Sequence, residues 1–197
     1  IVAATGVDAL AHVVECYTSK KATPLSDTYA AAGAKLIFRN IEQAYENPSD
    51  MEAKNNLLLG AFYGGVAITG SGTTAVHALS YPLGGKYHIA HGVSNAILLA
   101  PVMRFNEPAC RERLAAAYDR CIRGGAVTVE DKSAAVIAKL EGIVKHLDIP
   151  TSLTEFGVPK EDLEALVASG MEVTRLLVNN MREVTPDDAR RIYQEVL

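Results

Sequence analysis

Apolar residues recur along most of this chain at intervals of three and four positions, the spacing of an α-helix that buries one face. Residues 5–18, for example, carry an apolar stripe through Val7, Leu10 and Val14. Alternating runs of Val, Ile and Thr are nearly absent, so no strand is predicted. The pattern therefore predicts a single all-α domain, residues 1–197, of about nine or ten helices.

Clusters of Pro, Gly and Asn divide this pattern and place the ends of the predicted helices. The helices are expected over 5–18, from Pro24 to near Asn47, from Asp50 to a break at 69–72, around His77 as far as 82–87, from His91 to near Asn106, over 109–122, 129–146, 159–169 and 171–180, and from Thr185 onward with Pro186 at the first position. No repeat or low-complexity tract interrupts this organisation.

Composition and charge narrow the class of protein. Apolar residues make up 49% of the chain and charged residues 21%, which is typical of a soluble globular protein. The net charge is −4 with basic residues spread among acidic ones, so we expect no nucleic-acid partner. Cys16, Cys110 and Cys121 form no CxxC pair, which favours a reducing, cytoplasmic location. The chain begins at Ile1 without the features of a signal peptide, and we interpret it as a fragment of a longer protein.

One segment has the length of a membrane span. Residues 57–76 contain no charged side chain, and a helix of this length is able to cross a bilayer. The segment is rich in Gly, Ser and Thr, however, and no cationic cluster flanks it. These features favour a buried core helix, so we expect no membrane association.

The sequence GSGTTA at 70–75 matches the G-x-G-x-x-A fingerprint of dinucleotide-binding folds. That fingerprint follows a strand within a βαβ unit, and an acidic residue about twenty positions later binds the ribose. Here the first acidic residue after Gly72 is Glu107, and no βαβ pattern surrounds the motif. A glycine break between two packed helices is the better interpretation.

Asp8 and His12 are four residues apart, so on a helix their side chains project from one face and are able to share a cation. A structural interpretation competes with this one, because Thr5-x-x-Asp8 resembles a capping box at a helix start. Capping explains Asp8 but not His12, which lies in an apolar stripe where an isolated histidine is usually a core residue. Taken alone, the pair is more often structural than metal-binding.

His77, His88 and His91 lie close together in a chain that has only 5 histidines. His77 belongs to an apolar helix and His91 starts the next one, with a Pro-Gly-Gly turn between them, so these two imidazoles are able to converge. The direction of His88, in the loop, is not fixed by the sequence. Gly92 leaves room beside His91 for the close approach of a ligand or cofactor.

Considered together, Asp8, His12, His77 and His91 provide one carboxylate and three imidazole nitrogens. This donor set suits a divalent first-row metal such as Fe²⁺ or Zn²⁺, and it is too rich in nitrogen for Ca²⁺ or Mg²⁺. The two pairs support each other, and we predict that the four residues form one metal site.

At these residues the sequence resembles the iron-containing (group III) alcohol dehydrogenase family. TGVDALAHVVECYTS at 5–19 resembles the D-x-x-x-H helix of that family. AVHALSYPLGGKYHIAHGVSNAILLAPVMRFN at 75–106 resembles its long signature, with two histidines fourteen residues apart. The ending NNMREVTPDDARRIYQ at 179–194 is similar to the usual close of the family. The resemblance covers nearly the whole chain.

The resemblance implies a function as well as a fold. It implies that Asp8, His12, His77 and His91 bind Fe²⁺, with Zn²⁺ as the alternative, and that a small alcohol or aldehyde exchanges a hydride with NAD or NADP. It also implies the multi-helix C-terminal domain of the fold shared with dehydroquinate synthase, in a homodimer or larger assembly. The N-terminal α/β nucleotide-binding domain of that fold has no counterpart in this chain.

At Tyr81 the sequence departs from the family, many members of which carry a second histidine four residues after the first signature histidine, near the nicotinamide. That histidine is a candidate proton relay, and a phenol with its usual pKa of about 10 is a poorer base at neutral pH. His88 is a possible substitute. The resemblance thus implies Tyr81 and His88 as catalytic candidates, and Tyr81 and His91 as residues that face the cofactor.

Three other functions compete with that of an alcohol dehydrogenase. Within the superfamily, glycerol dehydrogenases tend to use fewer ligands of this type, and maleylacetate reductases act without the metal. A third alternative is a non-catalytic helical module that binds a structural metal or none. Closed structural zinc sites usually recruit Cys, and no cysteine lies beside these histidines. The full set of one Asp and three His favours the alcohol dehydrogenases.

Overall fold

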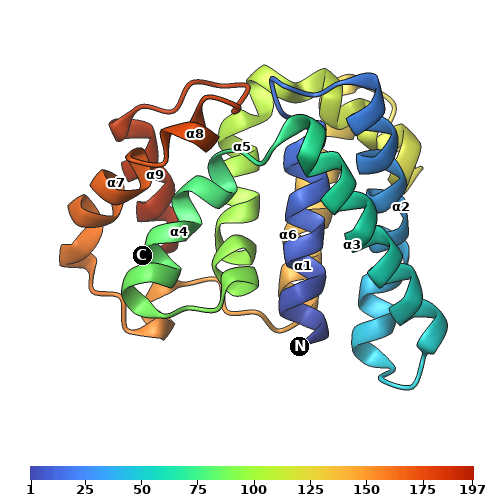
Figure 1. Ribbon diagram of the computed structural model, residues 1–197, viewed down its shortest axis with the longest axis horizontal. Helices are drawn as coiled ribbons and strands as arrows, with labels where there is room; N and C mark the ends of the chain where they lie inside the picture. Colours follow the sequence, from blue (N-terminus) through green and yellow to red (C-terminus); the bar gives the residue numbers. More distant parts are fainter.

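Helices provide almost all of the regular structure in the computed structural model, which describes residues 1–197 (Figure 1). The α-helices are α1 (Val2–Tyr17), α2 (Pro24–Glu46), α3 (Met51–Ser71), α4 (Ala75–Tyr87), α5 (His91–Ala117), α6 (Val129–His146), α7 (Leu163–Met171), α8 (Thr174–Leu177) and α9 (Pro186–Val196). A π-helical turn at Tyr118–Ile122 and 3₁₀ turns at Leu153–Phe156 and Lys160–Asp162 join some of them. The only β pairing is an isolated bridge between Ser19 and Asn180. The predicted all-α class is confirmed.

Several helices begin where the sequence signals place them. The Thr23 hydroxyl accepts a hydrogen bond from the Ser26 backbone N–H, and the Ser26 hydroxyl accepts one from Thr23, which completes a capping box before Pro24. Thr185 and Asp188 form the same reciprocal pair at the start of α9. Each cap satisfies N–H groups that have no partner within the helix.

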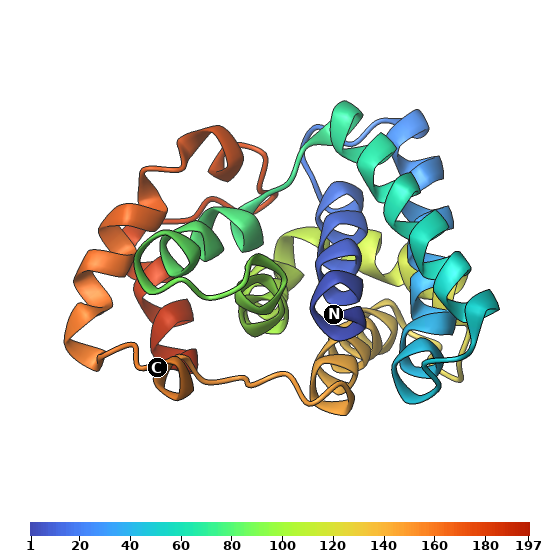
Figure 2. The ribbon, with the colours of Figure 1, turned by 60° about the horizontal axis from the view of Figure 1, so that its bottom comes forward.

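Helix α1 lies in the middle of the molecule and contacts α2 and α3 on one side and α5 on the other (Figure 2). Helix α4 packs against α5, and α7 bridges α4 and α9. The main hydrophobic cluster, of 41 buried residues, reaches from Val7 of α1 to Val196 of α9. This arrangement brings the N-terminal ends of α4 and α5 against the side of α1.

The structure corrects two predicted details of the helices. Helix α1 begins at Val2, so Thr5 lies inside it and its hydroxyl donates a hydrogen bond to the Ile1 carbonyl (3.0 Å) instead of capping a helix start. Asp8 is therefore free of the proposed capping role. The predicted division into two helices after Asn106 is present as a kink, not a loop: the backbone is non-helical at Cys110 (φ −126°, ψ 16°) and divides α5 into two helical parts.

The C-terminal third is less regular than predicted. The segment expected as one helix over 159–169 begins as a 3₁₀ turn and becomes α7 only at Leu163. The helix expected over 171–180 is reduced to the single turn α8, Thr174–Leu177.

The uncharged segment 57–76 is mostly α3, and the expectation that it is a buried core helix is wrong for its outer face. Leu58, Leu59 and Phe62 are exposed, whereas the buried side of α3 consists of small residues. Gly60 lies against Gly33 of α2, and a Cβ on Gly33 would stand 2.9 Å from the Gly60 carbonyl oxygen. Close contact of α2 and α3 therefore needs these glycines. None of the helices combines the length and apolar character required to cross a membrane.

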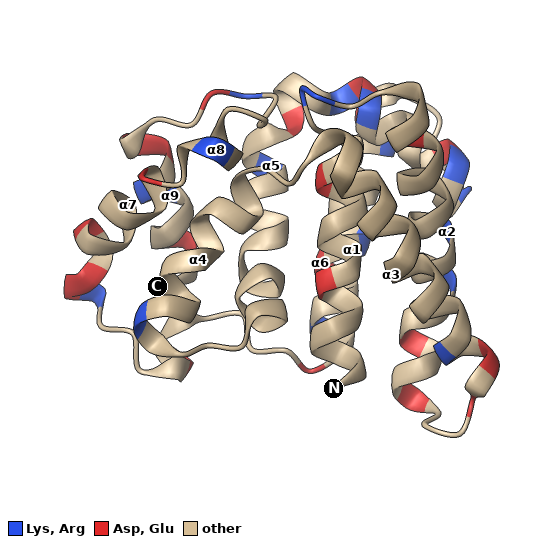
Figure 3. Cartoon of the chain, in the orientation of Figure 1, with Lys and Arg blue, Asp and Glu red and all other residues tan.

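The charged side chains are mixed in sign, and the cysteines are buried. Basic and acidic residues are interspersed over the outer helices, and the visible faces of α3 and α4 are largely uncharged (Figure 3). The three cysteines are free and buried. Burial raises the pKa of the Cys16 and Cys110 thiols to about 12 and that of Cys121 to about 11, so they are unreactive as thiolates at neutral pH.

Candidate metal centre

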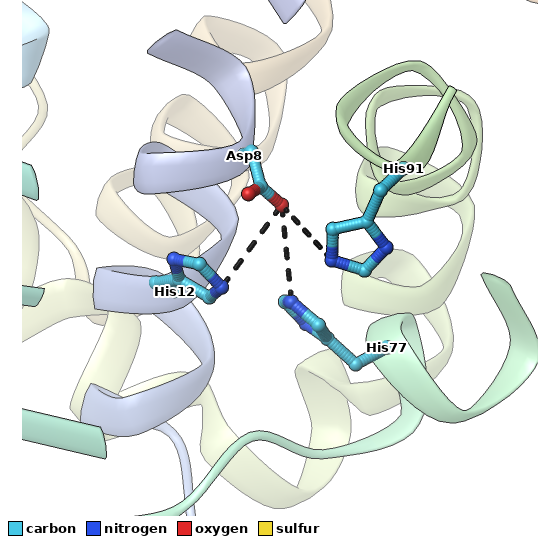
Figure 4. Close-up of side chains that lie close together, drawn as sticks. All are labelled: Asp8, His12, His77 and His91. Carbon is cyan, nitrogen blue, oxygen red and sulfur yellow. Dashed lines mark ion pairs between the residues drawn. The ribbon is translucent and has the colours of Figure 1, made fainter. Parts of the chain in front are cut away.

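The structure brings the four predicted ligands to one point (Figure 4). Asp8 and His12 project from the same face of α1, as their spacing of four predicts. His77 lies in the first turn of α4 and His91 is the first residue of α5. One ligand atom from each of the four side chains lies within 4.8 Å of all the others.

The distances in this cluster suit a small divalent cation. The Asp8 Oδ1 lies 4.0 Å from the His12 Nε2, 3.9 Å from the His77 Nε2 and 3.5 Å from the His91 Nε2. Metal–ligand bonds of about 2.0–2.2 Å in tetrahedral geometry place ligand atoms about 3.3–3.6 Å apart. The four side chains therefore need to move inward only slightly to coordinate one ion.

Asn95, four residues after His91 on α5, marks the centre of the cluster. Its Nδ2 lies 2.7 Å from the Asp8 Oδ1 and 3.2 Å from the Nε2 atoms of both His77 and His91. The Asn95 Oδ1, by contrast, is buried and has no hydrogen-bond partner. The Asp8 Oδ1 and the Nε2 atoms of His77 and His91 thus converge on a point that attracts positive charge, as a cation site requires. One carboxylate and three imidazoles fit Fe²⁺ or Zn²⁺.

Glu15, like Asn95, belongs to the site but was not predicted from the sequence. Its carboxylate is fully buried, and its Oε2 contacts the Nδ1 of His77, the ring nitrogen that faces away from the cluster. Its Oε1 accepts hydrogen bonds from backbone N–H groups at the start of α4. The signal lies in the sequence, because Asp8, His12 and Glu15 follow a spacing of four and three on one helix face.

The charges in the cluster shift several pKa values. Burial alone would lower the pKa of His77, but the charge and hydrogen bond of Glu15 outweigh it, so the pKa of His77 is raised. Burial alone would raise the pKa of Glu15, but the charge of His77 and its hydrogen bonds lower it. Burial lowers the pKa of His12, against the opposing charge of Asp8. The cluster therefore holds an ionised Glu15 beside a histidine that favours its charged form when no metal is bound.

The cluster is closed on one side and open on the other. The His77 side chain is 3% exposed, whereas that of His91 is 48% exposed. Tyr81, 37% exposed, lies on the open side with its ring centroid 6.1 Å from that of His91 and 6.5 Å from that of His77. The guanidinium of Arg175 lies over the Tyr81 ring, 5.7 Å from its centroid. Tyr81 and His91 thus border the exposed side of the cluster.

His88 does not join the cluster. It is exposed, it ends α4 in a left-handed conformation (φ 56°), and no hydrogen bond or ring contact connects its side chain to the four ligands. Its role in the turn is to reverse the chain between α4 and α5.

The two glycine motifs have structural roles. A Cβ on Gly92 would stand 2.2 Å from the carbonyl oxygen of Ala4, so the neighbour that needs the space is α1 itself and not the ligand or cofactor expected from the sequence. Gly72 of the GSGTTA motif ends α3 at a positive φ of 69°, with helices on both sides. The interpretation of that motif as a helix break is confirmed.

Comparison with known proteins agrees with this geometry. The sequence pattern of the Fe-containing alcohol dehydrogenase family, C-terminal, matches residues 2–197. Long-chain-alcohol dehydrogenase 1 of Geobacillus thermodenitrificans is 38% identical over 196 residues, which cover 98% of this chain and 49% of that protein. NAD-dependent methanol dehydrogenase of Bacillus methanolicus is 34% identical over 98% of this chain and 51% of its own length.

Solved structures show the same relation. A crystal structure of 1,3-propanediol oxidoreductase superposes with a TM-score of 0.94 at 30% identity, over 99% of this chain and 51% of that one. The iron-containing alcohol dehydrogenase of Thermotoga maritima gives a TM-score of 0.75 at 32% identity, over 100% of this chain and 49% of that one. The chain thus spans about half the length of these relatives. It belongs to the iron-containing alcohol dehydrogenase family and corresponds to the C-terminal domain of its members.

Proposed function

We propose that this chain is the metal-binding helical domain of an NAD- or NADP-dependent dehydrogenase that interconverts small alcohols and aldehydes. The convergence of Asp8, His12, His77 and His91 on one point is the observation that supports this function. The full set of one carboxylate and three imidazoles favours this reaction over a metal-independent reductase. In this proposal residues 1–197 form one helical domain of a two-domain enzyme, and the nucleotide-binding domain is a separate part of it.

Each residue of the cluster has a distinct task in this proposal. Asp8 contributes the negative charge, and the Nε2 atoms of His12, His77 and His91 complete the coordination of Fe²⁺, or of Zn²⁺ as the alternative. When bound, the metal supplies Lewis-acid polarisation of the substrate oxygen. The buried side chain of His77 excludes water from one side, so substrate enters past the exposed edge of His91.

Tyr81 and His91 border the open side, which supports their assignment to the face that meets the nicotinamide. Tyr81 is also the better candidate for holding the proton that the substrate hydroxyl exchanges, because its ring lies beside His77 and His91. His88 remains the second candidate, although its side chain makes no contact with the cluster.

Tyr81→Phe in the intact enzyme is expected to lower kcat by about 100-fold or more, the usual contribution of a positioned acid or base, and to leave metal content unchanged. Tyr81→His is expected to restore activity and to shift its pH optimum toward neutrality, because imidazole is the stronger base there. Steady-state pH profiles check both variants. An unchanged kcat in Tyr81→Phe together with a large loss in His88→Asn would transfer the role to His88.

The remaining assignments concern partners and location. The exposed Leu58, Leu59 and Phe62 on α3 support an assembly in which another chain or domain covers this face, consistent with a homodimer or larger oligomer. Three unpaired cysteines support a reducing, cytoplasmic location.

The function is tested by assaying the intact protein with short primary alcohols and NAD⁺ or NADP⁺. We expect turnover that is lost on treatment with a chelator and restored by Fe²⁺ or Zn²⁺ under anaerobic conditions. Full turnover in the chelator-treated protein would instead favour the metal-independent reductases. Binding of a metal without turnover of any alcohol or aldehyde would favour the non-catalytic module.

A further inference from the structure

Glu15 is a fully buried carboxylate with no Lys or Arg side chain to balance it. Its side chain is 0% exposed, and the one ion pair it forms is with His77. Removing a carboxylate from water costs several kcal/mol unless a positive partner and hydrogen bonds compensate. His77 is therefore the one side chain that places positive charge beside Glu15, as a protonated ring or as a ring bound to a cation.

The two oxygens of Glu15 have separate partners. The Oε1 accepts hydrogen bonds from the backbone N–H groups of Thr74 (3.0 Å) and Val76 (2.9 Å) and from the Thr74 hydroxyl (2.9 Å). It also lies 3.3 Å from the backbone N of His77. Helix α4 has no cap from its own N-cap side chain, so Glu15 of α1 caps it instead. The Oε2 is left to face the Nδ1 of His77.

This division has a consequence for the protonation of the His77 ring. A carboxylate oxygen only accepts hydrogen bonds, so the Nδ1 that faces it must carry a proton. In the neutral imidazole the Nε2 then carries a lone pair, and the Nε2 is the atom that faces Asp8 at 3.9 Å.

We propose that Glu15 is a positioning residue that holds His77 as the Nδ1–H tautomer and fixes α4 against α1, so that the His77 Nε2 points at the metal site. The role of Glu15 in metal binding rests on the proposed metal site. The tautomer of His77, by contrast, is a property of the metal-free protein. Carboxylates behind metal-binding histidines act in this way in general, and their loss weakens metal affinity by about 10–100-fold.

Glu15→Gln separates this role from a purely structural one. Several N–H and O–H donors converge on the Oε1 position, so the amide oxygen of the glutamine is expected to occupy it and to keep the cap on α4. The amide N–H₂ then faces the Nδ1 of His77, which must accept a hydrogen bond. The variant is therefore expected to keep the fold and to invert the tautomer to Nε2–H.

Thr74→Val provides the matched control. It removes one hydrogen bond to the Glu15 Oε1 and leaves the contact between Glu15 and His77 in place. It is expected to lower stability, to retain the Nδ1–H tautomer and to keep metal affinity within about threefold of that of the wild type, well short of the 10–100-fold effect.

The experiment combines ¹⁵N NMR of the histidine rings in metal-free protein with titration by Co²⁺, followed by absorption spectroscopy. The spectra are recorded at a pH high enough that the His77 signals no longer change. The inference requires Nδ1–H in the wild type and in Thr74→Val, Nε2–H in Glu15→Gln, and a 10–100-fold loss of Co²⁺ affinity in Glu15→Gln alone. A wild-type His77 with Nε2–H overturns it, as does Glu15→Gln with an unchanged tautomer or wild-type affinity. If the wild type binds no Co²⁺, the proposed metal function fails, whereas the tautomer comparison still decides the role of Glu15.

Discussion

His91→Ala is expected to abolish metal binding while leaving the fold intact. The His91 side chain supplies one of four converging ligand atoms, and it is 48% exposed, so its removal opens no cavity in the core. Loss of a direct ligand is expected to exceed the 10–100-fold effect that loss of a supporting residue has on metal affinity. Metal analysis after dialysis against Fe²⁺ or Zn²⁺, with circular dichroism to monitor the fold, checks the result. Activity of the intact enzyme is expected to disappear with the metal.

His146→Ala is the matched control, because His146 is exposed to a similar degree and pairs with Glu46 away from the cluster. It is expected to keep its metal and its activity. His77→Ala is expected to lose the metal as well, but it also leaves Glu15 buried without its ion-pair partner, which costs about 3–5 kcal/mol. Full metal occupancy in both His77→Ala and His91→Ala would rule out the assignment of these residues as ligands.

Gly92→Ala is expected to damage the centre without touching a ligand atom. The added methyl group would stand 2.2 Å from the Ala4 carbonyl oxygen and 3.3 Å from the Asp8 Cβ. Because a backbone carbonyl in a helix cannot move away cheaply, α5 must shift from α1, and His91 shifts with it relative to Asp8. We expect the free energy of unfolding to fall by about 1–3 kcal/mol and metal affinity to fall with it.

Gly142→Ala in α6 separates this clash from the general effect of a Gly to Ala change. A Cβ at Gly142 meets nothing within 4 Å, so the change is expected to stabilise the helix by about 0.5–1 kcal/mol. Urea unfolding of both metal-free variants, followed by metal titration, gives the comparison. If Gly92→Ala has wild-type stability and affinity, the close approach of α1 and α5 does not set the geometry of the centre.

Features that depend on neighbours in sequence were predictable. Thr23 with Pro24 and Thr185 with Pro186 mark helix starts because a cap and its helix are adjacent in the chain. Asp8 and His12 share a face because a helix fixes the direction of residues four apart. The convergence of these residues with the later histidines was inferred from the chemistry of the donor set, and the geometry confirms that the four lie together.

Features that depend on tertiary contacts were not predictable in the same way. The spacing of Glu15 places it on the helix face of His12, but the sequence does not show that His77, 62 positions later, is its partner. Gly92 was predicted to leave room beside His91 for a ligand or cofactor. The sequence cannot show that the backbone of α1 occupies the space next to Gly92. The capping box at Thr5 failed because α1 begins three residues earlier, at Val2, where the sequence has no start signal.

The most direct measurement is the stoichiometry and location of metal binding in the metal-free wild-type chain, under anaerobic conditions. Titration with Fe²⁺ or Zn²⁺ is expected to reach one ion per chain and, with Zn²⁺, to shift the NMR signals of His12, His77 and His91 while those of His146 stay in place. A chain that binds neither ion, or binds one without any change at these three histidines, would contradict the assignment of the cluster as a metal centre.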